Sequence, residues 1–467
     1  MKTKNGFNIK KLVLLVISIL AYVAIVNFPT PEGLTLEGKK AIALMITAVF
    51  VWATEVIPVA IASVILPMLV GILGISTVNE ALANFMNSTI IFMFAAQLIA
   101  AAFTHSGVGE RVSLKLSFLF GNRPNRVLLS FMLFTCVISM FLVDIPTAII
   151  FASIAYMILK DNNMEPGTSN FGRSVMIGIP IAAALGGFGT PVGSGLNILT
   201  VNLLAKHTGV MINFWQWSML GIPTALILTL IAWKIIQLLF PPEVSIIRGS
   251  ENVEERMRDL GALKAPEKKF IVVFLITVLF WITQPVTKID NTLVAAIAAG
   301  VFAFTGIDLI DWSHARTFVG WEGLFLVGGA TAVAMTLMTT GASKWIGDLL
   351  AQNLGGMNAL LVIFIVIVVG ILSHIPLPVG GAMVALMVPI IAQVAQQIGI
   401  NPIYLVLPLG FTVSCVFLIP LDPIPLATQN YGYWKMSDMV KAGVLVSVAW
   451  IVVLTIIMIL AYIVGLY

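Results

Sequence analysis

Long apolar segments recur along the whole chain, and they constrain its fold more than any other feature. A helix needs about 17–25 mainly apolar residues to cross a bilayer, and such runs return from Leu12 almost to the last residue. Hydrophobic residues make up 59% of the 467 residues and charged ones only 10%, whereas an ordinary soluble domain is roughly 25% charged. The sequence therefore predicts an all-α polytopic membrane protein and excludes a set of soluble domains.

The apolar runs predict about eleven transmembrane helices. The basic start, Met1 to Lys11, leads into an apolar run with no small-residue cleavage site after it, so we expect a retained first helix. Cys136 and Cys415 lie far apart inside apolar runs, which excludes a disulfide framework and predicts packing roles. The expected spans are 12–28, 41–56, 58–76, 86–105, 174–205, 213–240, 269–286, 290–306, 318–340, 403–430 and 441–466.

Two further apolar segments, 127–159 and 358–398, are each interrupted near their centre. The first carries Asp144 to Thr147 there, and the second carries His374 to Ala382 with two prolines and two glycines. Proline removes a helix hydrogen bond, and glycine weakens a helix interior. We therefore expect both segments to enter the membrane and return as re-entrant helical hairpins.

Basic residues gather on one side of this topology. An excess of Lys and Arg marks cytoplasmic loops, so we expect a multi-pass protein of the cell (inner) membrane with a cytoplasmic N-terminus. The same sorting explains the slight positive charge without a nucleic-acid partner. The residues on the N-terminal side are Arg111, Lys115, Arg123, Arg126, Lys160, Arg173, the cluster from Arg248 to Lys269, Arg316, Lys435 and Lys441.

The two halves of the chain look alike. Thr104 to Arg111 parallels Met338 to Trp345, and each stretch precedes an expected hairpin and then a span broken near its middle. The breaks are Thr190 to Gly195 and Pro420 to Pro425. An odd number of crossings separates the matching units, so we expect an inverted repeat. Discontinuous helices in corresponding places of such a repeat indicate the mid-membrane site of a secondary transporter.

This repeat predicts a division of the chain into five parts. They are scaffold helices in 1–80, a first repeat in 81–206 with hairpin 127–159 and broken helix 174–205, scaffold helices and a cytoplasmic loop (241–268) in 207–313, a second repeat in 314–440 with hairpin 358–398 and broken helix 403–430, and a C-terminal helix in 441–467.

Four interruptions at membrane depth predict a cavity, because non-helical backbone is tolerated there only inside the protein or beside water. Helix N-termini that point into the cavity would favour an anion, and freed carbonyls at helix C-termini would favour a small cation. The geometry thus indicates cation-coupled anion uptake.

Six short motifs follow one another in an informative order and spacing: Thr54-Glu55-Val56-Ile57-Pro58, Ser106-Gly107, Gly341 to Trp345, Val388-Pro389-Ile390, Tyr431 to Lys435, and Asp438-Met439. Together they resemble the divalent anion–sodium symporter family over nearly the whole chain. The resemblance implies an inverted-repeat fold with a hairpin entering from each side. It also implies a transport domain that moves against a dimeric scaffold in an elevator manner, and uptake of dicarboxylates, citrate or similar anions.

The chain departs from that family at the hairpin tips. Relatives carry a Ser-Asn-Thr triplet there, which binds sodium and the substrate carboxylate. The aligned positions here are Val143-Asp144-Ile145 and Val379-Gly380-Gly381. The hydroxyl before the first triplet is kept as Ser139 and the glycine of the first broken helix as Gly193, but Asp422 stands where a small neutral residue is usual.

Asp144 and Asp422 are the two acids of these breaks. An ionisable group at the bilayer centre costs at least about 2.5–3.5 kcal/mol on insertion scales, so a functional role is the first hypothesis. The alternative is a structural N-cap that accepts backbone N–H bonds. Two carboxylates would repel a doubly negative substrate, so sodium ions or protons must neutralise them, and coupling would follow.

We assign two overlapping sets of site residues from the breaks, the hairpin tips and the resemblance. His374 is equally well explained as a packed neutral histidine. The substrate set is Thr147, Ser194, Gly195, Asn197, His374, Gly380, Gly381 and Pro423. The cation set is Ser139, Val143, Asp144, Gly193, Pro378, Gly380 and Asp422, with sodium at Asp144, Gly193 and Asp422.

The predicted function is import of small organic anions, di- or tricarboxylates, coupled to sodium by elevator-type alternating access in a homodimer. Sodium or a proton is the only cofactor expected, as the coupling ion, with no organic cofactor. A proton-driven carrier of a different small anion and an uncoupled channel remain alternatives. A membrane enzyme is more distant, because the four histidines, His105, His207, His314 and His374, are scattered over different regions.

Overall fold

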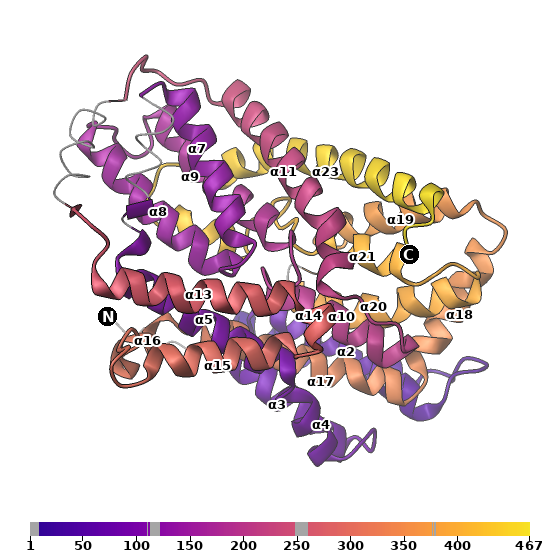
Figure 1. Cartoon of the computed structure of the whole chain (residues 1–467). Helices are drawn as coiled ribbons and strands as arrows, with labels where there is room; N and C mark the ends of the chain where they lie inside the picture. The colour runs from indigo at the N-terminus through magenta and orange to yellow at the C-terminus, as the bar shows by residue number, and fades with distance from the viewer. Residues whose placement is uncertain (1–8, 110, 113–121, 248–259, 376, 378–379) are drawn as a thin grey trace.

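The chain folds into α-helices that are packed side by side and end to end (Figure 1). The computed structural model describes residues 9–109, 111–112, 122–247, 260–375, 377 and 380–467. Its helices are α1 (Ile9–Asn27), α2 (Leu36–Thr54), α3 (Val59–Ile72), α4 (Val78–Phe85), α5 (Ser88–Ser106), α7 (Pro124–Ser139), α8 (Asp144–Asp161), α9 (Asn170–Gly187), α10 (Gly195–Thr208), α11 (Phe214–Leu239), α13 (Ala265–Ile282), α14 (Gln284–Thr287), α15 (Asn291–Ala303), α16 (Trp312–Phe318), α17 (Trp321–Thr339), α18 (Ala342–Leu354), α19 (Ala359–Leu372), α20 (Gly380–Gln397), α21 (Ile403–Thr412), α22 (Pro423–Gln429) and α23 (Met436–Val464).

Judged by length and composition, fewer helices could cross a membrane than the eleven that the apolar runs predict. In the described part of the chain, six stretches are long and apolar enough to span a membrane: α1, α4 with α5, α11, α17, α20 and α23. The remaining predicted spans do not form single long apolar helices, for physical reasons. α3 and α15 have only 14 and 13 residues, α2 and α13 begin with charged side chains, and two expected spans are each divided into two helices.

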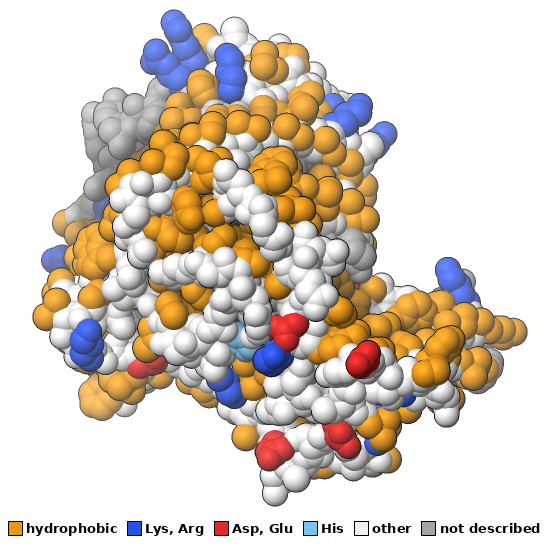
Figure 2. Space-filling view, turned by 90° about the vertical axis from the view of Figure 1, so that its right-hand side faces the viewer, with side chains coloured by type: hydrophobic (Ala, Val, Ile, Leu, Met, Phe, Trp, Pro, Cys, Tyr) orange, Lys and Arg blue, Asp and Glu red, His pale blue; other side chains and the backbone are white. Residues whose placement is uncertain are grey.

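Apolar side chains cover much of the surface, as a membrane-embedded protein requires. On the face shown in Figure 2 they form broad areas, and Lys and Arg side chains gather at the upper rim. Exposed large hydrophobic residues follow α1, α13, α15 and α23 over much of their lengths. These helices therefore present their apolar sides outward, whereas α9, α20 and α21 are buried over most of theirs.

The four interruptions fall inside the segments where the sequence predicts them. They separate α7 from α8, α9 from α10, α19 from α20, and α21 from α22. Two breaks begin earlier than expected, because Asp144 to Thr147 already form the first turn of α8, and Pro423 and Pro425 already lie in α22. Proline is tolerated in a first turn, where its missing N–H would have no helical partner.

The long helix of each half packs against helices of the other half. α5 of the first half packs against α13 and α15, and α17 of the second half packs against α2 and α3. In Figure 1, α13 and α15 lie side by side across the front, with α5 against them. Each half therefore provides the support on which the long helix of the other half rests.

Glycines allow the closest helix contacts around the first hairpin. A Cβ at Gly186 of α9 would overlap the carbonyl of Cys136 in α7 and would lie 2.8 Å from Cβ of Ser139. Neither neighbour is a flexible side-chain end, so the helices themselves would have to separate. The close approach of α7 to α9 thus depends on this glycine.

Gly186→Ala should therefore destabilise the purified protein by about 1–3 kcal/mol, the usual cost of overpacking. Gly300→Ala is the matched control, because a Cβ at Gly300 in α15 meets nothing within 4 Å. It should be neutral or stabilising by roughly 0.5–1 kcal/mol, the gain of alanine over glycine in a helix. Thermal unfolding in detergent measures both, and equal melting temperatures would contradict the packing argument.

Candidate functional site

Main-chain carbonyl oxygens converge on Gly193, in the break between α9 and α10. A Cβ built on Gly193 would lie 2.5 Å from the oxygen of Gly187, 2.9 Å from that of Ser139 and 3.1 Å from that of Met140. These oxygens come from the C-terminal ends of α7 and α9, where carbonyls lack helical partners. The three carbonyls around Gly193, hereafter the carbonyl cluster, form an oxygen-rich spot that only a glycine leaves open.

Asp144 brings a carboxylate to the same turn. Its side chain is only 5% exposed, and its Oδ2 atom would lie 2.9 Å from a Cβ at Gly187. The Ser194 hydroxyl interacts with this carboxylate, and the Ile145 amide donates to its Oδ1 atom at 2.8 Å. A buried carboxylate beside several main-chain carbonyls favours a small cation, because oxygen atoms are the ligands that hard cations prefer.

The other polar residues of the first break hold its backbone. Ser139 donates to the carbonyl of Ala183 at 2.6 Å, and Thr190 donates to that of Met140. Asn197 uses its side-chain amide to bind the carbonyls of Gly187 at 2.7 Å and Thr190 at 2.8 Å. These donors satisfy main-chain oxygens that the interrupted helices leave without partners.

The first hairpin tip is fixed in the same way. Thr147 is buried and donates to the carbonyls of Leu142 and Val143. Val143 precedes Asp144 as its helix cap and is itself buried among apolar side chains. Thr147, which the sequence places in the substrate set, is therefore engaged with the turn before its own helix.

Asp422 lies in the second break, within electrostatic range of Asp144. Its Oδ1 atom accepts the amide of Ile424 at 2.9 Å, so Asp422 is the N-cap of α22. The exposed Pro423 follows as the first residue of that helix. α22 packs against both α8 and α9, so the structure brings the two aspartates of the two halves together.

His374 lies just after α19, in the interruption between α19 and α20. It is 2% exposed, and its Nε2 atom lies 3.0 Å from the carbonyl oxygen of Thr412 in α21. Its Nδ1 atom has no hydrogen-bond partner in the described structure. A neutral ring that donates through Nε2 fits this environment, and Nδ1 is then an unused acceptor.

The second hairpin tip meets apolar side chains at its two glycines. A Cβ at Gly380 would lie 2.8 Å from Cδ1 of Leu196, and one at Gly381 would lie 3.0 Å from Cγ2 of Val327. A Cβ at Gly195, at the start of α10, would overlap the side chain of Met93 in α5. The starts of α10 and α20 therefore adjoin each other. Pro378, a member of the expected cation set, lies outside the described residues.

The structure thus assembles the first-half residues Ser139, Asp144, Gly193, Ser194 and Asn197 into one polar turn, with Asp422 nearby. Sequence reasoning missed the carbonyls of Met140 and Gly187, because a main-chain ligand leaves no side-chain signature. It also missed Met93, Leu196 and Val327, which read as ordinary apolar residues. The pair Gly186-Gly187 was the one available signal, since adjacent glycines permit close backbone approach.

Interrupted helices, a carbonyl cluster and two neighbouring acids inside an apolar helical body define a membrane transport protein. Sequence comparison makes this specific. Residues 9–466 match the family described as the sodium:sulfate symporter transmembrane region, and the chain belongs to this family. The chain is a secondary transporter, not an enzyme.

Individual relatives are similar over nearly their whole length. The sodium-dependent dicarboxylate transporter SdcS of Staphylococcus saprophyticus is 26% identical over 482 residues, which cover 98% of this chain and 92% of that protein. SdcS of Staphylococcus aureus RF122 is 28% identical over 99% of this chain and 93% of its own. A membrane protein of Cupriavidus necator is 28% identical over 88% of this chain and 84% of its own.

Two solved transporters share the fold at low identity. MtrF of Neisseria gonorrhoeae gives a TM-score of 0.54 at 12% identity and covers 97% of this chain and 95% of its own. The YdaH transporter of Alcanivorax borkumensis gives 0.52 at 12% identity, over 95% of this chain and 96% of its own. These likenesses extend over the whole helical arrangement and confirm the expected polytopic membrane fold.

If the carbonyl cluster binds sodium, Gly193→Ala should abolish that binding, because the added methyl group would occupy the space that the three oxygens surround. Thermal unfolding with sodium chloride against choline chloride measures this binding, since an ion that binds only the folded state raises its stability. The variant should lose the sodium-specific rise while Gly300→Ala keeps it. A variant that sodium stabilises as strongly as wild type would exclude this location.

Proposed function

We propose that this chain imports small organic anions, di- or tricarboxylates, together with sodium across the cell membrane. The single observation that carries the proposal is the carbonyl cluster at Gly193 with the Asp144 carboxylate beside it. The family and the names of the SdcS relatives support sodium as the coupling ion and a dicarboxylate as the first substrate to test.

In this proposal the first half binds sodium through the carbonyls of Ser139, Met140 and Gly187 and the carboxylate of Asp144. The cation charge offsets the carboxylate, which would otherwise repel an arriving anion. Asp422 takes part in the same electrostatic balance because it interacts with Asp144. Sodium and anion would then bind together more strongly than either alone, which is the requirement for coupling.

The anion would bind where the hairpin tips approach the breaks of the two crossing helices. The start of α10 adjoins that of α20 there, and Asp144 at the start of α8 interacts with Ser194 just before α10. Helix N-termini favour negative charge. Ser194, Gly195, Asn197, Gly380, Gly381 and Pro423 are the proposed contacts, with Thr147 and His374 as residues that shape the tips. Met93 and Leu196 add apolar surface beside them.

The movement that we propose is of the elevator type. α5 packs against helices of the second half, and α17 packs against helices of the first half. These paired contacts support an inverted repeat, because two inverted copies would produce contacts of this kind. The proposal includes the five-part division of the chain into scaffold and repeats, a homodimer and a cytoplasmic N-terminus. The excess of Lys and Arg in the loops on one side supports the orientation.

Asp144→Asn and Asp422→Asn test the electrostatic coupling in proteoliposomes. Each should raise the sodium concentration for half-maximal uptake of labelled succinate or citrate by roughly tenfold, because a lost charge-assisted contact is worth about 1.4 kcal/mol or more. Asp308→Asn, at an exposed loop position, should leave that concentration unchanged.

The same assay decides among the alternatives. Uptake driven by an imposed proton gradient and indifferent to sodium would favour the proton-coupled carrier. Flux that does not saturate and does not accumulate against a gradient would favour a channel. Unaltered sodium dependence in both aspartate variants would remove the coupling role that we assign to the two acids.

A further inference from the structure

The long helices α5 and α17 end in the same way. α5 is followed by Gly107 with φ 81° and ψ 0°, and α17 by Gly341 with φ 77° and ψ 3°. In both places the amide four residues later bonds the glycine carbonyl, from Arg111 at 3.4 Å and from Trp345 at 3.0 Å. A left-handed glycine turns the chain sharply at each junction, and one side chain follows at the same offset.

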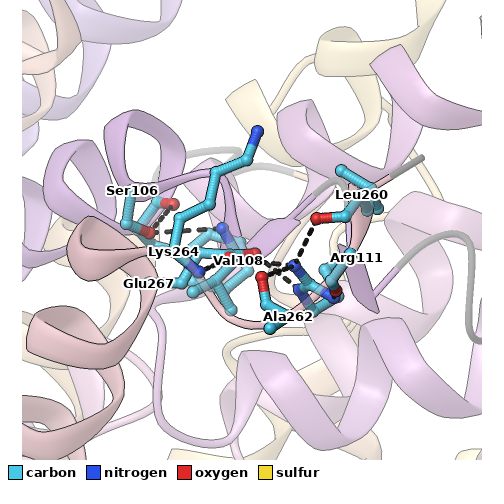
Figure 3. Close-up of polar contacts among 9 residues, drawn as sticks. Ser106, Val108, Arg111, Leu260, Ala262, Lys264 and Glu267 are labelled. Atoms are coloured by element: carbon cyan, nitrogen blue, oxygen red, sulfur yellow. Dashed lines mark hydrogen bonds and ion pairs between the residues drawn. The ribbon is translucent and has the colours of Figure 1, made fainter. Parts of the chain in front are cut away.

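Arg111 binds the loop in front of α13 (Figure 3). Its Nε and Nη2 atoms donate to the Glu267 carboxylate at 2.6 and 3.0 Å. Nη1 donates to the carbonyl of Gly261 at 3.0 Å, and Nη2 donates to those of Ala262 at 3.2 Å and Leu260 at 3.4 Å. The ion pair is mostly buried, with side-chain exposures of 13% and 4%, so opening it would leave a charge poorly compensated.

Trp345 binds the loop in front of α2 at the corresponding place of the second half. Its Nε1 atom donates to the carbonyl of Glu32 at 3.0 Å, and its ring lies against Gly33. The hydroxyl of Thr35 donates to the carbonyl of Thr340, beside the glycine turn, at 3.1 Å. This junction is therefore tied to the entry of α2 by a side chain from each partner.

The two attachments are reciprocal. The junction after α5 is tied to the entry of α13, against which α5 packs, and the junction after α17 is tied to the entry of α2, against which α17 packs. Each attachment lies between a long helix and the hairpin that follows it in sequence. Each half thus fixes the start of the segment that leads to the hairpin of the other half.

We propose that Arg111 and Trp345 are a matched pair of positioning residues that hold the junctions after α5 and α17 stationary while the hairpins move. The inference rests on the proposed elevator movement. It adds that the two junctions stay fixed and so define where the movement begins and ends. Neither residue touches the ions or the anion. Loss of an attachment therefore lowers the rate of movement and leaves binding unchanged.

Transport kinetics in proteoliposomes test the pair. Arg111→Gln and Trp345→Phe should each lower the maximal rate of sodium-driven succinate uptake by roughly five- to tenfold, the factor that one hydrogen bond is worth. The KM for succinate and the thermal shift caused by sodium chloride should stay within about twofold of wild type. Phenylalanine keeps the ring of Trp345 and removes only the Nε1 donor.

The controls are Arg126→Gln and Trp215→Phe, two exposed residues of the same types, which should transport as wild type. The double variant Arg111→Glu with Glu267→Arg should recover part of the rate by restoring the ion pair. Wild-type rates in both single variants would overturn the proposal. So would a parallel loss of rate and sodium binding, because that is the result of a merely destabilised fold.

Hydrogen exchange with and without sodium gives a test that needs no transported substrate. Amides of 107–109, 111, 112 and 341–345 should exchange at equal rates in the two conditions, while those of α8 and α20 change. Equal changes in all four regions would overturn the fixed attachments. No effect of sodium in any region, together with sodium-independent uptake by wild type, would instead count against the proposed function.

Discussion

The structure depends on how an apolar body satisfies the main-chain groups of interrupted helices. Within a bilayer, an N–H or C=O without a partner costs several kcal/mol, so a broken helix persists only if something replaces its hydrogen bonds. Around the first break this is done by the side chains of Ser139, Thr190 and Asn197, each donating to a carbonyl. Two of the oxygens around Gly193, those of Met140 and Gly187, accept these bonds, and a carbonyl oxygen has a second lone pair. Together with the oxygen of Ser139 they supply the cation site that we propose.

The same constraint explains how much of the fold could be predicted from the sequence. The class of fold followed from apolar runs, and the broken segments followed from Pro, Gly and Asp inside them, because each of these residue types conflicts with a buried helix interior. The ends of the helices were harder to predict. Pro146 and Pro423 were expected in the breaks but lie in first turns of α8 and α22, since proline suits both a break and a helix start.

The candidate site was predictable where it consists of side chains and not where it consists of backbone. Asp144 and Asp422 stood out because acids are costly at membrane depth, and they do lie near each other. The carbonyls of Met140 and Gly187 could not be found, because every residue has a carbonyl and only the three-dimensional path of the chain directs it. Ser139, predicted for the cation set, lies beside the carbonyl cluster, yet its hydroxyl is directed at the protein's own backbone.

Asn197 joins the two ends of the turn between α9 and α10 by binding Gly187 and Thr190 with one amide group. A loop closed in this manner is already ordered before any ion arrives, so capture of the ion costs little conformational entropy. In the proposed mechanism, the first ion would therefore need no help from the organic anion to form its site. The cation would load first, and the anion would follow into a pocket whose charge has already been lowered.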